Sequence, residues 1–251
     1  IYKFGGSMKY LDITVNKEGY IEFESDKAKI VFSTAETGKN FNRHTEDGVK
    51  TLNAIIEEFE VDEVAYMRQV HSSTVHVLSN EDIKEFIEKE GDAIITSKTN
   101  TAIGVFTADC VPVIVVDDIK GVVAVVHSGW RGTISSITKK TIETMNRKFN
   151  TDYRDVKVYV GPHIRKCCYE VSQELKETFL EETRIPEEVL FDGRRLSLEE
   201  CILKDIREIG VLEENIYTLN LCTYCNEDIR LHSYRKSNGD YGRLFSFVIL
   251  K

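Results

Sequence analysis

The feature of the sequence that most constrains the fold is a series of four short β-branched segments between residues 93 and 127. The segments are 93–96, 102–107, 111–116 and 122–127, and turn residues separate them. Each is apolar at consecutive positions, which is typical of strands that are buried on both faces. We therefore expect sheets that are covered on both sides, and the turn at 118–121 predicts a hairpin between the last two segments.

Segments with the apolar spacing of helices lie before and after these strands. We expect helices at 45–59, 81–90, 133–149, 171–182 and 197–209, the last beginning with a capping box at Ser197-Leu-Glu-Glu200. Further strands are expected at 156–160, 216–219, 229–234 and 244–249. Because helices and strands are mixed along the whole length without a break in composition, the sequence predicts a single α/β (α+β) domain with mixed sheets over residues 8–251.

Charge and composition exclude several classes of protein. The chain has 33 Lys+Arg against 42 Asp+Glu, a net charge of −9, so it lacks the basic surface that non-specific nucleic-acid binding requires. No segment approaches the roughly 18 consecutive apolar residues of a membrane helix. We therefore expect neither a nucleic-acid nor a membrane partner, and no sequence feature indicates a protein partner.

The cysteine content and the N-terminus predict a cytoplasmic location. Six cysteines in 251 residues are too few for a disulfide scaffold, which favours a reducing compartment. Residues 1–7 carry no cleavable signal pattern and read as the remnant of a tag before Met8, so we leave them out of the fold prediction.

Three side chains that could bind a metal stand at the ends of strand-like segments: His71, Cys110 and His127. One thiolate and two imidazoles suit zinc, with a fourth position left for water or substrate. The spacing matches no zinc-finger pattern, and each side chain could equally be a buried structural residue. The segment 128–132 favours a functional site, because its two glycines let the backbone approach a ligand beside a Trp and an Arg.

Six blocks of sequence resemble the laccase-domain family, in the family's order and from about residue 32 to the C-terminus. They are Arg68-Gln-Val-His71, Gly91-Asp-Ala93, Thr107-Ala-Asp-Cys-Val-Pro112, His127-Ser-Gly-Trp-Arg-Gly132, Gly161-Pro162 with Cys167-Cys-Tyr-Glu170, and Ser233-Tyr-Arg235 with Gly242-Arg243. Two positions depart from the family's common pattern: Ser72, where glycine is usual, and Ser128, where alanine is usual.

The resemblance implies one domain in α/β/β/α layers and a zinc ion bound by His71, Cys110 and His127, which would also be the catalytic residues. The family was formerly named for polyphenol oxidase, and its bacterial members are regarded as purine nucleoside phosphorylases of broad specificity. This implies phosphorolysis of adenosine, inosine and S-methyl-5'-thioadenosine, together with hydrolytic deamination of adenosine. Purine nucleosides and phosphate would then be the small-molecule partners.

Phosphorolysis requires cations that hold phosphate in line with the glycosidic bond. Guanidinium groups suit phosphate oxygens, and the candidates are Arg43, Arg131, Arg235 and Arg243. We favour Arg131 and Arg235, because both lie inside motif blocks, and retain Arg43 as a further substrate residue.

Three other polar residues in or near the motif blocks could take part in the site, but the sequence supports a functional role for them less strongly. Gln69 could hydrogen-bond the ligand or only a strand edge, and Asn42 could contribute from an N-terminal loop. Asp109 could orient a ligand histidine or cap a turn, and the sequence favours neither reading.

The sequence around the remaining cysteines gives weaker evidence for a metal-binding or redox role. Cys222-Thr-Tyr-Cys225 is a C-x-x-C pair without a thioredoxin-like context, and Cys167 and Cys168 could complete four thiolates with it. Structural burial is the favoured reading for these residues, and Cys201 is expected on the apolar side of a helix, in the core of the protein.

Two alternatives to a zinc enzyme remain open. The first is a copper-dependent polyphenol oxidase, but six histidines are too few for a blue-copper site plus a trinuclear cluster, so copper is the less favoured metal. The second is a metal-free hydrolase with Cys110 as nucleophile and His127 or His71 as base.

Overall fold

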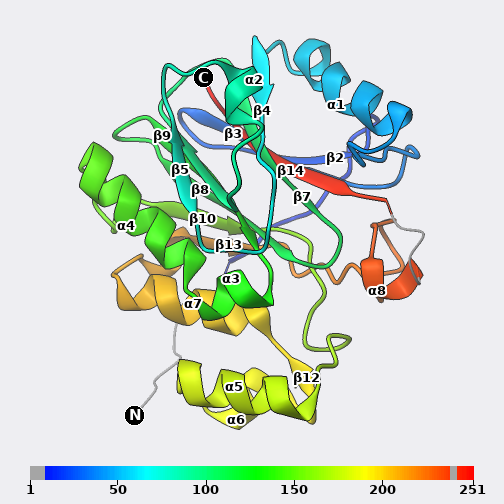
Figure 1. Ribbon diagram of the computed structural model, residues 1–251, viewed down its shortest axis with the longest axis vertical. Coiled ribbons are helices and arrows are strands. Elements are labelled where there is room, and N and C mark those ends of the chain that lie inside the picture. Colours follow the sequence, from blue (N-terminus) through cyan, green and yellow to red (C-terminus); the bar gives the residue numbers. More distant parts are fainter. Residues whose placement is uncertain (1–8, 238–241) are drawn as a thin grey trace.

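The computed structural model describes residues 9–237 and 242–251, so the prediction for residues 1–7 and the boundary at Met8 lies outside it. Two mixed sheets face each other (Figure 1). The seven-stranded sheet has the order β1 (Lys9–Tyr10), β13 (Ile216–Thr218), β10 (Lys157–Val160), β8 (Val111–Asp117), β9 (Val122–Ser128), β6 (Ala93–Thr96), β5 (Val75–Leu78). The five-stranded sheet has the order β2 (Tyr20–Glu24), β3 (Ala28–Ser33), β14 (Leu244–Leu250), β7 (Thr101–Thr107), β4 (Glu63–Ala65).

Helices cover the outer face of each sheet. The seven-stranded sheet is covered by α3 (Trp130–Ile134), α4 (Ile137–Phe149) and α7 (Leu198–Glu208), and the five-stranded sheet by α1 (Glu46–Glu58) (Figure 1). Beyond α7 lie α5 (Gln173–Thr183), α6 (Glu187–Leu190) and the hairpin of β11 (Phe191–Asp192) and β12 (Arg195–Leu196). Short helices are α2 (Ile83–Phe86), α8 (Tyr234–Ser237) and the 3₁₀ turn Glu213–Asn215. The mixed α/β class and the α/β/β/α layers expected from the sequence are confirmed.

Alternation along the central strands explains why their sequence is apolar throughout. In β8, Val111, Val113 and Val115 pack against the helices, whereas Ile114 and Val116 fill the space between the two sheets. Because successive side chains point to opposite faces, a strand with layers on both sides needs apolar residues at every position. The four segments between residues 93 and 127 are accordingly strands β6 to β9, and all of their residues are buried.

Several local predictions hold and others need correction. The turn before Gly121 joins β8 and β9 as an antiparallel hairpin, and the Ser197 hydroxyl caps α7 by accepting from the Glu200 amide. The helix expected over 133–149 is divided into α3 and α4, because Ser136 takes a left-handed backbone with φ of 56°. The helix expected over 81–90 shortens to α2.

The strand expected over 229–234 is wrong. The Arg230 carbonyl accepts from the Ala35 amide and the Arg230 amide donates to the Glu36 carboxylate, so this segment is tied to a loop and joins no ladder. Ile229 and Leu231 still pack on the core between the sheets, which accounts for the alternating apolar pattern. In the described part of the chain, no helix has the length and apolar character that crossing a membrane requires.

Candidate active site

The three predicted metal ligands come from separate segments and converge at one end of the sheets. His71 lies between β4 and β5, Cys110 lies where the chain passes from β7 in one sheet to β8 in the other, and His127 is near the end of β9. Their ligand atoms all lie within 4.8 Å of one another. The Cys110 sulfur is 3.8 Å from His71 Nε2, and the His71 and His127 ring centroids are 4.8 Å apart.

Asp92, immediately before β6, holds two of these ligands in place. Its carboxylate is fully buried and accepts from His127 Nδ1 at 2.8 Å and from the His71 amide at 3.1 Å. The amide and the hydroxyl of Ser72 donate to its second oxygen at 2.6 and 2.7 Å. With Nδ1 bonded to the carboxylate, His127 presents Nε2 to a metal, and the aspartate fixes both the ring and the tautomer. Sequence reasoning assigned no role to Asp92, although its block, Gly91-Asp-Ala93, was among the recognised motifs.

Backbone constraints bring the ligands close together. His71 has a left-handed backbone with φ of 58°, which is a strained conformation. The hydrogen bond from the His71 backbone amide to the Asp92 carboxylate helps to hold it. Gly129 follows the third ligand, and a Cβ there would lie 2.8 Å from His71 Cδ2 and 3.2 Å from the Cys110 sulfur. The site is therefore too tight for any side chain at position 129.

The electrostatics of the cluster favour a charged thiolate. Burial raises the pKa of the Cys110 thiol, but His127 and His71 outweigh burial and lower that pKa from 9.0 to about 6. Burial lowers the pKa of His127, but the Cys110 thiolate and the Asp92 carboxylate raise it to about 9. Hydrogen bonds from His127 and Ser72 keep the Asp92 pKa below its usual value despite burial. The two directions together favour a thiolate on Cys110 and a proton on His127, and a metal ion would displace that proton.

The cluster opens into a cavity of about 450 Å³, a size that suits a small-molecule ligand. Rings from Phe41, Phe106, Trp130, Tyr169 and Tyr234 line it, so it offers several aromatic faces. The structure also brings all of the predicted substrate residues to this wall: Asn42, Arg43, Gln69, Asp109, Arg131, Arg235, Arg243.

Arginines dominate the charge of the cavity. Arg43 lies over Phe106, Arg131 over Trp130 and Arg235 over Tyr169, with guanidinium-to-centroid distances of 5.7, 4.4 and 5.1 Å. Arg43 and Arg235 also donate to the backbone carbonyls of Met67 and Glu170. Within the described residues, none of these three arginines forms an ion pair with a carboxylate, so their charges remain available to an anionic ligand.

The side chains of Gln69 and Asp109 are held by protein groups. The Gln69 amide donates to the Phe106 carbonyl at 2.8 Å and accepts from the Phe106 amide at 2.7 Å, which is the strand-edge reading. Asp109 accepts from the Thr223 hydroxyl at 2.6 Å and from the Arg235 amide at 2.8 Å, so it caps the turn that begins α8. Of the two readings left open for Asp109, the structure supports the turn cap, and Asp92 is the carboxylate that orients a ligand histidine.

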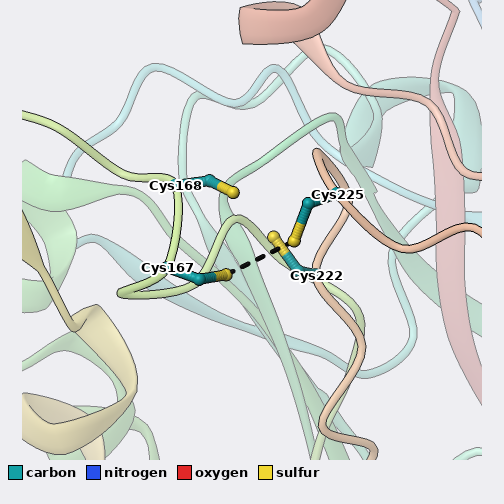
Figure 2. A group of neighbouring side chains, drawn as sticks. All are labelled: Cys167, Cys168, Cys222 and Cys225. Atoms are coloured by element: carbon teal, nitrogen blue, oxygen red, sulfur yellow. Dashed lines mark hydrogen bonds between the residues drawn. The ribbon is translucent and has the colours of Figure 1, made fainter.

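The cysteine predictions need one correction. Cys201 lies in the core as expected, and Cys222 is also buried. Burial is the wrong explanation for Cys167 and Cys225, which are exposed, and the four thiols of Cys167, Cys168, Cys222 and Cys225 form a group of their own (Figure 2). All six cysteines are free thiols, and the cytoplasmic location stays a prediction.

The residues present fit a single metal ion better than a copper cluster. All six histidines are in the described part of the chain, yet only His71 and His127 join the metal-ligand group. Three others do not line the cavity, and their rings are hydrogen-bonded to backbone carbonyls: His76 to Glu90, His163 to Gly161, His232 to Lys39. One thiolate with two imidazoles, oriented by a buried carboxylate, is a donor set for a mononuclear site with an open position.

Comparison with known proteins decides the family. A family model described as multi-copper polyphenol oxidoreductase laccase matches residues 27–251. The chain belongs to this family. Two solved structures superpose on it with a TM-score of 0.85: YfiH of Bacillus licheniformis, at 22% identity over 95% of this chain and 99% of that one, and YlmD of Geobacillus stearothermophilus, at 23% identity over 95% and 98%. These likenesses establish the fold.

Two curated relatives carry names that describe an activity. A purine nucleoside phosphorylase of Clostridium acetobutylicum is 44% identical over 239 residues, which are 94% of this laccase-family chain and 98% of that protein. An adenosine deaminase from an unknown prokaryotic organism is 33% identical over 184 residues, which are 68% of this chain and 70% of that protein. Neither name mentions oxidation of a phenol.

Proposed function

We propose that the chain is a zinc-dependent purine nucleoside phosphorylase that cleaves adenosine, inosine and S-methyl-5'-thioadenosine with phosphate, and that it also deaminates adenosine. The observation that carries the proposal is the cavity itself, in which a mononuclear metal-ligand set faces Arg43, Arg131 and Arg235, three arginines without a carboxylate ion pair within the described residues. The names of the Clostridium acetobutylicum relative and of the deaminase support the same substrate class.

In phosphorolysis, the arginines of the cavity would bind the phosphate and its aromatic side chains would contact the nucleoside. Arg43, Arg131 and Arg235 would hold phosphate through charge-assisted hydrogen bonds, and rings such as Trp130 and Tyr169 would flank the purine. A phosphate oxygen then forms a bond to the sugar C1' while the C1'–N9 bond breaks; the electron pair of that bond leaves with the purine, which takes up the proton that hydrogen phosphate gives up. Positive charge on the sugar is greatest midway, where the held phosphate dianion stabilises it.

Deamination would use the same cavity with water as the nucleophile at C6 of the purine and ammonia as the leaving group. A bound zinc ion would supply Lewis-acid chemistry, assisting departure of the base or activating water. His71, Cys110 and His127 would hold this ion, and Asp92 would keep the His127 ring in position. Removal of one ligand should therefore abolish both activities.

Product analysis by chromatography tests the proposal directly. With zinc and phosphate present, we expect adenosine to give adenine and ribose 1-phosphate, and without phosphate we expect inosine alone. His71→Ala should lose both reactions, whereas His76→Gln, which changes a histidine outside the cavity lining, should retain them. Intact adenosine and inosine in the presence of zinc and phosphate would contradict the proposal.

The metal and its chemistry can be separated from the two alternatives. Protein from cells grown without added copper should contain zinc at this site, and stoichiometric copper without zinc would favour the oxidase. A metal-free thiol hydrolase is a second candidate, because the pKa of Cys110 is lowered to about 6 beside His127, which is the pairing of an activated thiol. Activity that survives complete zinc removal but is lost in Cys110→Ser would establish that candidate instead.

A further inference from the structure

We propose that Cys167, Cys168, Cys222 and Cys225 bind a second, structural zinc ion outside the active site. The inference is independent of the proposed function, because it concerns a different group of ligands and makes no use of the substrate cavity. Figure 2 shows the four side chains, which come from two loops far apart in the sequence, with their sulfur atoms turned toward one another. None of the four lines the cavity.

The sulfur positions are close to those of a tetrathiolate site. All four Sγ atoms lie within 4.8 Å of one another, and those of Cys167 and Cys225 are 3.5 Å apart. Zinc–sulfur bonds of about 2.3 Å in a tetrahedron place the sulfurs about 3.8 Å apart. Shifts of about an ångström or less would therefore complete the coordination shell, without any change in the path of the two loops.

Neither burial nor a disulfide explains the group as well. Cys167 and Cys225 are exposed, so apolar packing does not account for them, and disulfide pairing would require two separate pairs, whereas all four sulfurs converge.

The choice of zinc follows from the ligands and their spacing. Thiolate sulfur is a soft ligand that selects zinc, copper(I) or iron–sulfur clusters. Four sulfurs within 4.8 Å of one another surround room for one ion, and a cluster with several irons between its thiolates would spread them farther apart. Four thiolates in tetrahedral array are the usual closed shell of a structural zinc site.

Such an ion would stabilise the wall of the active site. The loop with Cys167 and Cys168 also carries Tyr169, which lines the cavity, and the segment after Cys225 leads to Arg235. Between the two loops the backbone amide of Thr223 donates to the His163 carbonyl at 3.0 Å. The Thr223 hydroxyl reaches Asp109, the residue that accepts from the Arg235 amide. Joining the loops through four metal–sulfur bonds would fix this chain of contacts.

Metal content per chain tests the inference. We compare wild type with the double variant Cys222→Ser/Cys225→Ser, and with Cys201→Ser as a matched control that changes a thiol outside the group. The double variant should lose one equivalent of zinc and melt at a lower temperature, and the control should keep its metal. His71→Ala should lose a different equivalent, so the loss at the four thiols can be recognised whether or not the active site binds zinc.

A second measurement uses the unaltered chain, in case the double variant does not fold. Cadmium-substituted wild type should give a ¹¹³Cd resonance in the region of four-thiolate sites, separate from any signal of the mixed nitrogen and sulfur site. An unchanged zinc content in the double variant would overturn the inference, as would the absence of that resonance from wild type. One equivalent of iron in place of zinc would overturn it as well.

Discussion

Replacing Asp92 by asparagine should lower both the zinc affinity of the site and the stability of the metal-free protein. The carboxylate accepts from His127 Nδ1, from the His71 amide, and from the amide and hydroxyl of Ser72. Asparagine has nearly the same shape, but one of the two oxygens becomes an NH₂ group. If the remaining oxygen faces His127, the new NH₂ group points at the Ser72 amide, and two donors then face each other in a fully buried place.

The contacts set the magnitude of the effect. One buried amide left without an acceptor costs about 1–3 kcal/mol, and the loss of charge weakens the bond to His127 by a similar amount, so we expect the metal-free protein to lose about 3 kcal/mol of stability. Loss of a carboxylate that orients a ligand histidine typically lowers metal affinity about 10- to 100-fold. Because Ser72 and His71 are neighbours, the left-handed backbone of His71 is also less well held.

The assay is a competition titration of zinc against a chromophoric chelator, with denaturant unfolding of the metal-free protein alongside it. Asp117→Asn is the matched control, since Asp117 is equally buried but lies at the far end of β8, and one of its oxygens has no hydrogen-bond partner in the described residues. A zinc affinity in Asp92→Asn equal to that of wild type would refute the role assigned to Asp92. An equal loss of affinity in Asp117→Asn would show that the effect is one of stability alone.

Three further predictions concern the thiolate, the anion site and the tight turn. In metal-free protein the ultraviolet thiolate signal of Cys110 should titrate near pH 6 and be missing from Cys110→Ser. Because the folded pKa lies below the ordinary value, the thiolate's contribution to stability is present above that value and is lost as the pH falls through about 6; a midpoint near pH 9 would contradict this. Arg235→Ala should raise the KM for phosphate about ten- to a hundredfold, as expected for one charge-assisted hydrogen bond, while Arg154→Ala on the surface leaves it unchanged. Gly129→Ala should lose the equivalent of metal held by His71, Cys110 and His127, measured as metal per chain, because its Cβ would press on His71 at 2.8 Å; retention of that equivalent would refute the packing argument.

Burial determines which parts of the fold were predictable from the sequence. Strands β6 to β9 have layers on both faces, so their apolar runs are unambiguous. Strands β2 to β5 were not predicted, because they are short or lie toward sheet edges, where polar side chains such as those of Glu22 and His76 interrupt the pattern. The error at 229–234 has the opposite cause, since Ile229 and Leu231 alternate like strand residues but reach the core from a loop.

The ligand triad could be predicted and the residue that organises it could not. His71, Cys110 and His127 stand out because each lies in a motif block of the laccase-domain family, whereas their spacing alone matches no zinc-site pattern. Asp92 acquires its role only through the register of β6 with β9, in which Ala93 faces Val126 and places the preceding carboxylate beside His127. Asp109, next to Cys110 in the sequence, was one candidate for that role, but its carboxylate is engaged by Thr223 and the Arg235 amide.

Strand and loop pairing also explains why the ligand group of this chain differs from what the family description, with its several copper ions, would lead one to expect. The family description refers to several copper ions, and binding several copper ions would require several histidines close together. The chain has six histidines, and how many of them can share one site depends on which ones the fold brings together. The fold joins two of them to one thiolate, and hydrogen bonds to backbone carbonyls hold His76, His163 and His232 elsewhere. The thiol-rich group at Cys167 and Cys222 is likewise a product of loop pairing. The donor set that the fold assembles, and not the number of candidate ligands in the sequence, therefore decides which metal chemistry is available.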